Sequence, residues 1–318
     1  MSAAASVWSP WVRTIAATSM AAGLGCGGRG SPADRAPRSP ELFAPGRVST
    51  ARPEFATSFS PDGRTVYFDV ASDDRSKLEM VHAVLEDGQW SEARPLRFSD
   101  GTYRDVDPFV TADGRRLYFS SNRPLSGTAP KPDFGTWFVE RTAGGWGAPV
   151  HAGPALDSSA NEVYVSLTRS GTVYFGSDAA GQGRRDIYRA PLVGGEYRPE
   201  RISLRMAGAA PDQPDLAAGN PCIDPGERFL VFVADGGPDN PDLFISWRRD
   251  GRFGPARNLG PAVNSSQADF APALGPDGET LYFTSERPGV VPAGAVPGRP
   301  PGDIYRVDLA AILAAAPG

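Results

Sequence analysis

The sequence predicts an all-β protein, specifically a β-propeller of five four-stranded blades closed by an N-terminal strand. Three observations lead to this prediction. One segment recurs five times along the 318 residues, four of the copies offer four strand signals each and the last offers three, and 37 glycines and 32 prolines are scattered throughout the chain. Scattered Gly and Pro suit many tight turns between short strands, and four-stranded units of about fifty residues are typical of propeller blades.

Each copy of the repeat begins with a hairpin. In the first copy, residues 60–63 read Ser-Pro-Asp-Gly and residues 65–68 read Thr-Val-Tyr-Phe. Glycine accepts the positive φ of a tight turn, and the β-branched and aromatic residues favour the strand that follows. The glycines that anchor the five copies are Gly63, Gly114, Gly171, Gly226 and Gly278.

Two further strand signals complete each copy. A third strand is predicted at residues 79–81, 136–138, 186–188, 242–244 and 303–305, and a fourth at an aromatic residue followed by proline, namely Trp90, Trp146, Tyr197 and Phe253. The fifth copy lacks this fourth strand, and residues 42–48 resemble it, so the N-terminus is predicted to complete the last blade and remove an exposed edge. A sixth blade is the alternative if residues 196–220 hold a degenerate copy.

These repeats resemble those of TolB-like propellers with WD40-like Pro-Asp-Gly repeats (PD40). The resemblance covers residues 42–308, with its strongest copies at Gly114, Gly171 and Gly278. It implies the fold, and also a secreted or periplasmic bacterial protein. TolB-type proteins carry an additional α/β domain, for which this sequence offers no candidate, so a function transferred from them is analogy.

The first residues are predicted to be a targeting signal. One positive charge precedes a short apolar stretch at residues 14–24, and Cys26 follows it. The stretch is too short to span a bilayer, which needs about 20 residues. The pattern resembles a bacterial lipoprotein signal, which implies lipidation of Cys26; an ordinary cleaved signal is the alternative. The predicted division is a signal at 1–25, a flexible tether at 26–40, the propeller at 41–309 and a tail at 310–318.

Composition excludes several classes of function. The net charge is −5 without a basic run, which leaves no electrostatic footprint for nucleic acid. Two cysteines cannot by themselves form a disulfide framework or a four-ligand zinc site, and the presence of only two histidines further limits metal chemistry, so no metal or other cofactor is expected. His82 and His151 are predicted to be isolated, and Cys222 to be a small buried apolar residue.

An acidic residue stands nine positions before the anchor glycine in four of the five copies, with Ala217 in the fourth copy. Equivalent positions should lie at one mouth of the central channel, where a ring of carboxylates could bind a ligand. Because the position recurs with the repeat, a structural hydrogen bond to the next blade is the competing explanation. The ligand-binding candidates are Glu54, Asp105, Glu162 and Asp269.

The favoured function is an extracytoplasmic, membrane-tethered binding scaffold for an envelope protein or polysaccharide. We expect a monomeric domain without catalytic residues. Two Pro/Gly-rich inserts, 124–134 and 288–302, are long for blade loops and favour a recognition face. The alternative is a glycan-active enzyme, resembling glycoside hydrolases, that uses the carboxylates at the channel mouth. A structural lid or assembly factor of the envelope is a third option.

Overall fold

The structure, a computed structural model, describes residues 39–72, 77–181, 184–210, 212–235, 240–289 and 302–314. It is a five-bladed β-propeller, as predicted. The predicted signal, Cys26 and most of the tether lie outside the described residues. In the described part of the chain, no helix is long and apolar enough to cross a membrane, and the one α-helix, α1, spans Ala310–Ala314.

Each blade is an antiparallel sheet whose first three strands follow the chain order. Blade 1 holds β2 (Glu54–Phe59), β3 (Thr65–Ala71), β4 (Leu78–Glu86), β5 (Gln89–Trp90) and β6 (Arg94–Pro95). Blade 2 holds β7 (Asp105–Val110), β8 (Arg116–Ser121), β9 (Gly135–Thr142), β10 (Gly145–Trp146) and β11 (Val150–His151). Blade 3 holds β12 (Glu162–Leu167), β13 (Val173–Ser177), β14 (Asp186–Ala190), the short β15 (Leu192–Val193) and β16 (Glu196–Tyr197), and β17 (Glu200–Arg201).

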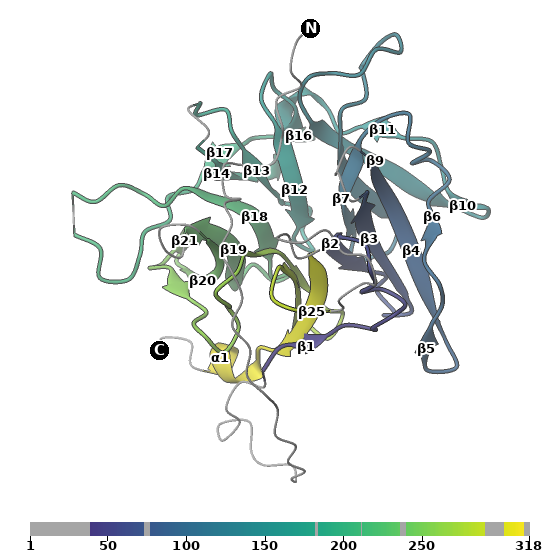
Figure 1. Cartoon of the computed structure of the whole chain (residues 1–318). Helices are drawn as coiled ribbons and strands as arrows, with labels where there is room; N and C mark the ends of the chain where they lie inside the picture. The colour runs from purple at the N-terminus through teal and green to yellow at the C-terminus, as the bar shows by residue number, and fades with distance from the viewer. Residues whose placement is uncertain are drawn as a thin grey trace, which may run out of the picture.

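The last two blades follow the same plan. Blade 4 holds β18 (Ala218–Ile223), β19 (Phe229–Asp235), β20 (Pro241–Arg249), β21 (Arg252–Phe253) and β22 (Arg257–Asn258), and blade 5 holds β23 (Asp269–Leu274), β24 (Thr280–Ser285), β25 (Asp303–Asp308) and β1 (Glu41–Leu42). The blades follow one another around the molecule, and β2, β7, β12, β18 and β23 form the inner ring (Figure 1).

The predicted closure by the N-terminus is confirmed. β1 pairs with β25, Glu41 opposite Arg306 and Leu42 opposite Tyr305, and the purple β1 lies beside the yellow β25 (Figure 1). The amide of Phe43 extends this pairing by donating to the carbonyl of Ile304 over 2.9 Å. The paired segment is shorter than the predicted 42–48, because a turn begins at Ala44 and accepts the amide of Arg47.

The fourth strand of each blade differs from the prediction. The aromatic residues Trp90, Trp146, Tyr197 and Phe253 lie instead in short hairpin extensions at the blade tips, β5, β10, β16 and β21. The strand that completes the blade follows within a few residues, as β6, β11, β17 or β22. In blade 3 this strand is β17, and residues 202–217 form no further sheet in their described part, so no sixth blade is present there.

The turn of the fourth copy is also shifted by one residue from the prediction. Gly63, Gly114, Gly171 and Gly278 have φ between 69° and 86°, whereas in blade 4 the positive φ, 61°, belongs to Glu227 rather than to Gly226. The residue of blade 4 equivalent to the acidic position is therefore Ala218 and not Ala217. The Asp224 side chain accepts the amide of Gly226 and supports this different turn.

Every inner strand carries a bulge two residues after its start. The register with the second strand shifts between residues 55 and 58, and at the equivalent places in the other four blades. A bulge places one residue outside the ladder and bends the strand. The residues at the bulges have left-handed φ values between 48° and 60°: Ala56, Asp107, Tyr164, Asn220 and Ala271.

The core lies between neighbouring blades. Phe43, Phe59, Trp90 and Tyr282 pack against one another where blade 5 meets blade 1, with ring centroids 4.4–6.3 Å apart. Aromatic pairs in such edge-on or tilted geometries add to the free energy gained from burial. Other buried apolar clusters likewise join residues of adjacent blades.

Candidate functional site

The register of the strands defines two faces of the propeller. We call the side where the inner strands begin the start face and the side of the turns between first and second strands the turn face. Asp105 at the beginning of β7 pairs with Ser121 at the end of β8, so the loop 122–134, which contains the predicted insert 124–134, leaves the sheet at the start face. The four candidate acids lie on this same side, as predicted from the repeat.

The structure buries all four candidate carboxylates; Glu54, Asp105, Glu162 and Asp269 are each at most 2% exposed. Glu54 accepts hydrogen bonds from the Thr50 amide, over 3.0 Å, and hydroxyl, over 2.5 Å. Burial raises the pKa of Glu54 to about 8, although these hydrogen bonds act in the opposite direction.

The other glutamate has the same kind of partner. Glu162 accepts the Ser158 amide over 2.9 Å and hydroxyl over 2.7 Å, and the Ser177 hydroxyl over 3.0 Å. Burial raises its pKa, and the hydrogen bonds from Ser158 oppose the shift. A Ser or Thr four residues upstream thus recurs beside three of the four acids, as Thr50, Ser158 and Ser265.

The two aspartates pair with arginines. Arg123 donates from Nε and Nη2 to Asp105, over 3.1 and 2.6 Å, and Arg287 donates to Asp269 over 2.7 Å. Each arginine belongs to the same blade as the aspartate that it pairs with. Burial raises the pKa of Asp105, with Arg123 opposing the shift.

The partners of the four acids thus come from their own blade and the connection before it, and not from the next blade. Every carboxylate already accepts at least two hydrogen bonds. Such groups stabilise the connection at the start of four of the five blades.

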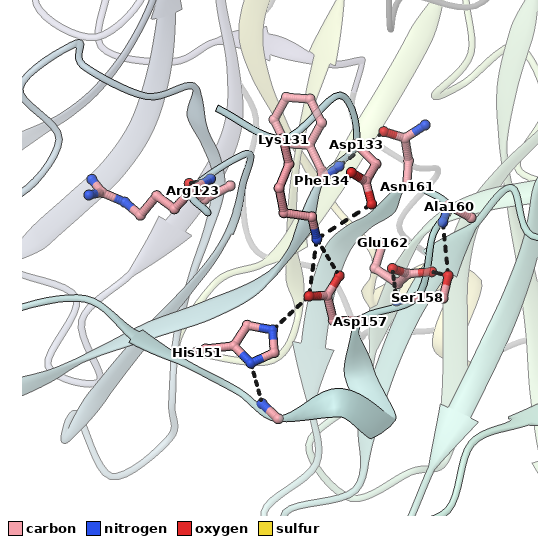
Figure 2. A network of polar contacts seen from close by, with 12 residues as sticks. Arg123, Lys131, Asp133, Phe134, His151, Asp157, Ser158, Ala160, Asn161 and Glu162 are labelled. Atoms are coloured by element: carbon pink, nitrogen blue, oxygen red, sulfur yellow. Dashed lines mark hydrogen bonds and ion pairs between the residues drawn. The ribbon is translucent and has the colours of Figure 1, made fainter. Parts of the chain in front are cut away.

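A second polar network holds the insert of blade 2 (Figure 2). Lys131, in the insert, donates to the two carboxylate oxygens of Asp157 over 2.8 and 3.1 Å, and lies 3.4 Å from Asp133. Nε2 of His151 lies 2.8 Å from the same Asp157. The prediction that His151 is isolated is therefore wrong.

A glycine at the start of β9 leaves room for this network. A Cβ atom at Gly135 would lie 2.5 Å from Oδ1 of Asp157, so only glycine allows the carboxylate to approach β9 so closely. Asn161 accepts the Phe134 amide over 3.2 Å and donates to Asp178 over 2.7 Å. The loop is thus attached to the connection between blades 2 and 3 at both its lysine and its last residue.

We expect Lys131→Met to loosen this insert. Losing the ion pair at a side chain that is 19% exposed should lower the free energy of unfolding by about 1–3 kcal/mol, and cleavage by a protease within 124–130 should accelerate. Urea unfolding and limited proteolysis measure the two effects. Lys77→Met, at an exposed position, is the matched control; equal behaviour of the two variants would contradict the anchoring role.

An axial cavity of about 340 Å³ lies between the inner strands and reaches the turn face. None of the four candidate acids is among the described residues that line it. Its acidic residue on the inner ring is instead Asp107, whose amide donates to Asp69 over 2.7 Å. Sequence reasoning missed this pair. An alignment of the five copies contains a signal for it, because the position of Asp107 is acidic only in blade 2 and the position of Asp69 only in blade 1.

Comparisons with known proteins give similarity of structure only. No protein-family model matches the chain, and no curated protein matches it. The catalytic domain of a GH62 α-L-arabinofuranosidase from Coprinopsis cinerea has a TM-score of 0.50 and 15% identity, over 86% of this chain and 98% of that one. This similarity concerns the fold.

Two TolB structures are also similar. Putative TolB from Agrobacterium tumefaciens has a TM-score of 0.45 and 16% identity, over 73% of this chain and 69% of that one. TolB from Acinetobacter baumannii has a TM-score of 0.46 and 13% identity over 82% of this chain, which spans 55% of that protein. The TolB propellers that the repeats resemble are thus among the similar structures, while no family model supports the Pro-Asp-Gly repeats. The class of the protein is a five-bladed β-propeller.

Proposed function

We propose that this propeller is an extracytoplasmic binding scaffold, tethered to a membrane through Cys26, that binds a protein or polymer of the cell envelope on its start face. The signal-like sequence before Cys26 supports the location. The domain acts as a monomer, and neither nucleic acid nor a cofactor takes part.

The observation that carries this proposal is the fixed insert of blade 2. Lys131, Asn122 and Phe134 attach its second half and its two ends to neighbouring strands and connections. Between them Leu125 is 64% exposed, a large apolar side chain on a loop held in place. An anchored loop loses little conformational entropy when it binds, and an exposed apolar residue on it can serve as an anchor for the partner.

We propose further that the chain is not an enzyme. The carboxylates that could perform acid–base chemistry on a glycan are each buried and already hydrogen-bonded, in three blades out of four to a Ser or Thr that belongs to the repeat. A pair that cleaves a sugar bond must reach the substrate from two sides. Asp105→Asn and Glu162→Gln should therefore leave the release of reducing sugar from envelope polysaccharides unchanged at background; turnover that either variant abolishes would support the glycan-active alternative.

The binding proposal is tested by crosslinking the tethered protein in its own envelope and identifying captured components by mass spectrometry. Leu125→Asp should remove a component that the unchanged protein captures, because a buried charge without a partner opposes association. Leu192→Asp is the matched control, since Leu192 is similarly exposed, at 51%, on β15.

Three outcomes are informative. Loss of the component with Leu125→Asp alone supports the start face as the binding surface. Equal capture by both variants removes the insert from the interface. Equal capture by a Cys26→Ser variant contradicts the need for the tether.

A further inference from the structure

The axial cavity is a second place where this molecule can bind a ligand, on the opposite face from the insert. Its volume of about 340 Å³ is at the lower end of the range for small-molecule sites, roughly 300–1,000 Å³. All five blades contribute residues to its wall. It is therefore large enough for one small organic molecule.

The inner end of the cavity is closed by apolar side chains. The residues of the inner strands that line the cavity run from the bulges to the turns, and none of the described residues before a bulge is among them. Phe55, Val106 and Val163 stand directly before three of the bulges, are each at most 6% exposed, and pack in one cluster with Phe134 of the insert. A ligand therefore enters from the turn face.

The wall of the cavity offers a rigid apolar surface. Six of its residues are prolines, namely Pro61, Pro108, Pro221, Pro225, Pro272 and Pro276. Four of the five Ser and Thr hydroxyl groups of the lining are already hydrogen-bonded to the protein, those of Ser58, Ser60, Thr111 and Ser166. Burial of an apolar group against such a wall is favourable, because it removes apolar surface from water.

The mouth of the cavity is formed by equivalent residues of the five turns. We call the residue two positions before the positive-φ residue of each turn the mouth residue. All five mouth residues line the cavity: Pro61, Ala112, Arg169, Pro225 and Pro276. Blade 3 alone carries a charged side chain there. A structural role shared by the blades would recur with the repeat, so the repeat does not explain Arg169.

The Arg169 side chain lies beside the turn of blade 4. Its amide donates to the carbonyl of Pro225 over 2.9 Å. A Cβ atom on Gly226 would lie 3.8 Å from Nη1 of Arg169 and 3.8 Å from Cγ of Arg228. Arg228 pairs with Asp224 over 2.7 Å, whereas Arg169 is exposed and forms no ion pair with a described residue. Two arginine side chains thus meet at one turn, and only one of them has a carboxylate partner.

The three acids of the lining already accept hydrogen bonds. Asp107 is 5% exposed, and its carboxylate accepts an amide of the next blade over 3.3 Å. Asp224 pairs with Arg228. Asp277 accepts the amide of Thr280 over 2.9 Å and its hydroxyl over 2.6 Å. The acids of the lining therefore have donors, whereas the cation Arg169 has no acid among the described residues.

We propose that the axial cavity binds a small organic acid, whose carboxylate pairs with Arg169 at the mouth while its apolar body packs against the prolines of the wall. A carboxylate matches the planar guanidinium group, since two parallel N–H groups can donate to its two oxygens. The apolar body adds the free energy of burial. This site lies apart from the start face and goes beyond the proposed scaffold function, on which it does not depend.

The test is calorimetry and thermal unfolding of the full chain with two acids, hexanoate and benzoate. Their neutral counterparts are hexanol and benzyl alcohol, their amine counterparts are hexylamine and benzylamine, and acetate lacks the apolar body. At about pH 8 the acids are ionised and the amines are protonated. At least one acid should bind and raise the unfolding temperature, and its counterparts and acetate should bind more weakly by about fivefold or more.

Arg169→Ala gives blade 3 the mouth residue of blade 2 and should weaken binding of the acid by about threefold to tenfold. Binding of the neutral counterpart should not change. Because Arg169 is exposed, the fold should persist. Arg115→Ala is the matched control, since it removes the same charge from the turn face at a side chain that is 85% exposed and lies outside the lining.

Ala112→Trp is an independent variant that narrows the mouth. Ala112 is an exposed mouth residue, so a large ring there should weaken binding of the acid and of its neutral counterpart alike. Ala143→Trp, at an exposed position between β9 and β10, is the matched control and should leave binding unchanged.

Several results would overturn the proposal. They are failure of both acids to bind, binding of the acids no tighter than that of the alcohols, and binding that Arg169→Ala leaves unchanged. Binding that Arg169→Ala weakens and Ala112→Trp does not would place the anion on the surface outside the cavity, and would overturn it too. No envelope component enters these measurements, so their failure leaves the scaffold proposal untouched.

Discussion

Phe43→Ala is expected to lower the free energy of unfolding by about 3–5 kcal/mol, the usual cost of removing a buried aromatic ring from a core. Phe43 is 3% exposed and its ring lies 4.9 Å from that of Tyr282 and 5.5 Å from that of Trp90, centroid to centroid. The residue follows β1 directly, so its packing holds the N-terminal strand against β25. Its loss leaves a cavity at the junction of the first and last blades.

Urea unfolding of the full chain, followed by tryptophan fluorescence and circular dichroism, measures this effect. Leu125→Ala is the control, because Leu125 is 64% exposed and its truncation should change stability by less than about 0.5 kcal/mol. A loss below about 1 kcal/mol for Phe43→Ala would mean that the stability of the propeller does not depend on its closure by the N-terminal strand.

The second large effect is a loss of stability as the pH rises from about 4.5 to 8. Burial raises the pKa of Glu54 from 4.5 to about 8 and that of Asp107 from 3.8 to about 7. In this range the unfolded chain has released both protons and the folded protein still holds them. Because the folded state binds more protons, stability falls with rising pH, by up to about 1.4 kcal/mol per pH unit for each carboxyl group.

Glu54→Gln and Asp107→Asn should each flatten this dependence, since an amide keeps an acceptor oxygen and has no proton to lose. Urea midpoints at several pH values measure the slope. Glu86→Gln, at an exposed position at the end of β4, is the matched control and should leave the slope unchanged. A slope that neither buried variant alters would show that both carboxyl groups ionise normally in the folded protein.

The sequence by itself determined the architecture of this protein. The Pro-Asp-Gly turns and the Tyr-Phe strands are local signals, because φ and β preference depend on the residue and its immediate neighbours. Repetition then placed equivalent residues at equivalent heights, which brought Glu54, Asp105, Glu162 and Asp269 to the start face and assigned residue 42 to the last blade.

Local sequence signals did not locate every turn and strand correctly. In blade 4 the turn moved from Gly226 to Glu227, because the Asp224 carboxylate accepts the Gly226 amide and the Arg228 amide and so stabilises another turn. The fourth strands lay after the aromatic residues and not at them, since the aromatics form the tip hairpins of the blades. Two-residue strands carry too little pattern to be located by sequence.

Only the tertiary structure decided which polar groups meet. Lys131 and Asp157 are 26 residues apart, and Asp69 and Asp107 are 38 apart in different blades. Whether a carboxylate is paired, buried or open to a cavity depends on what lies opposite it in space, and sequence spacing does not contain that information. The repeat therefore predicted the height of each residue along the channel, whereas the burial of the four acids and the contact between Asp69 and Asp107 followed from packing between blades.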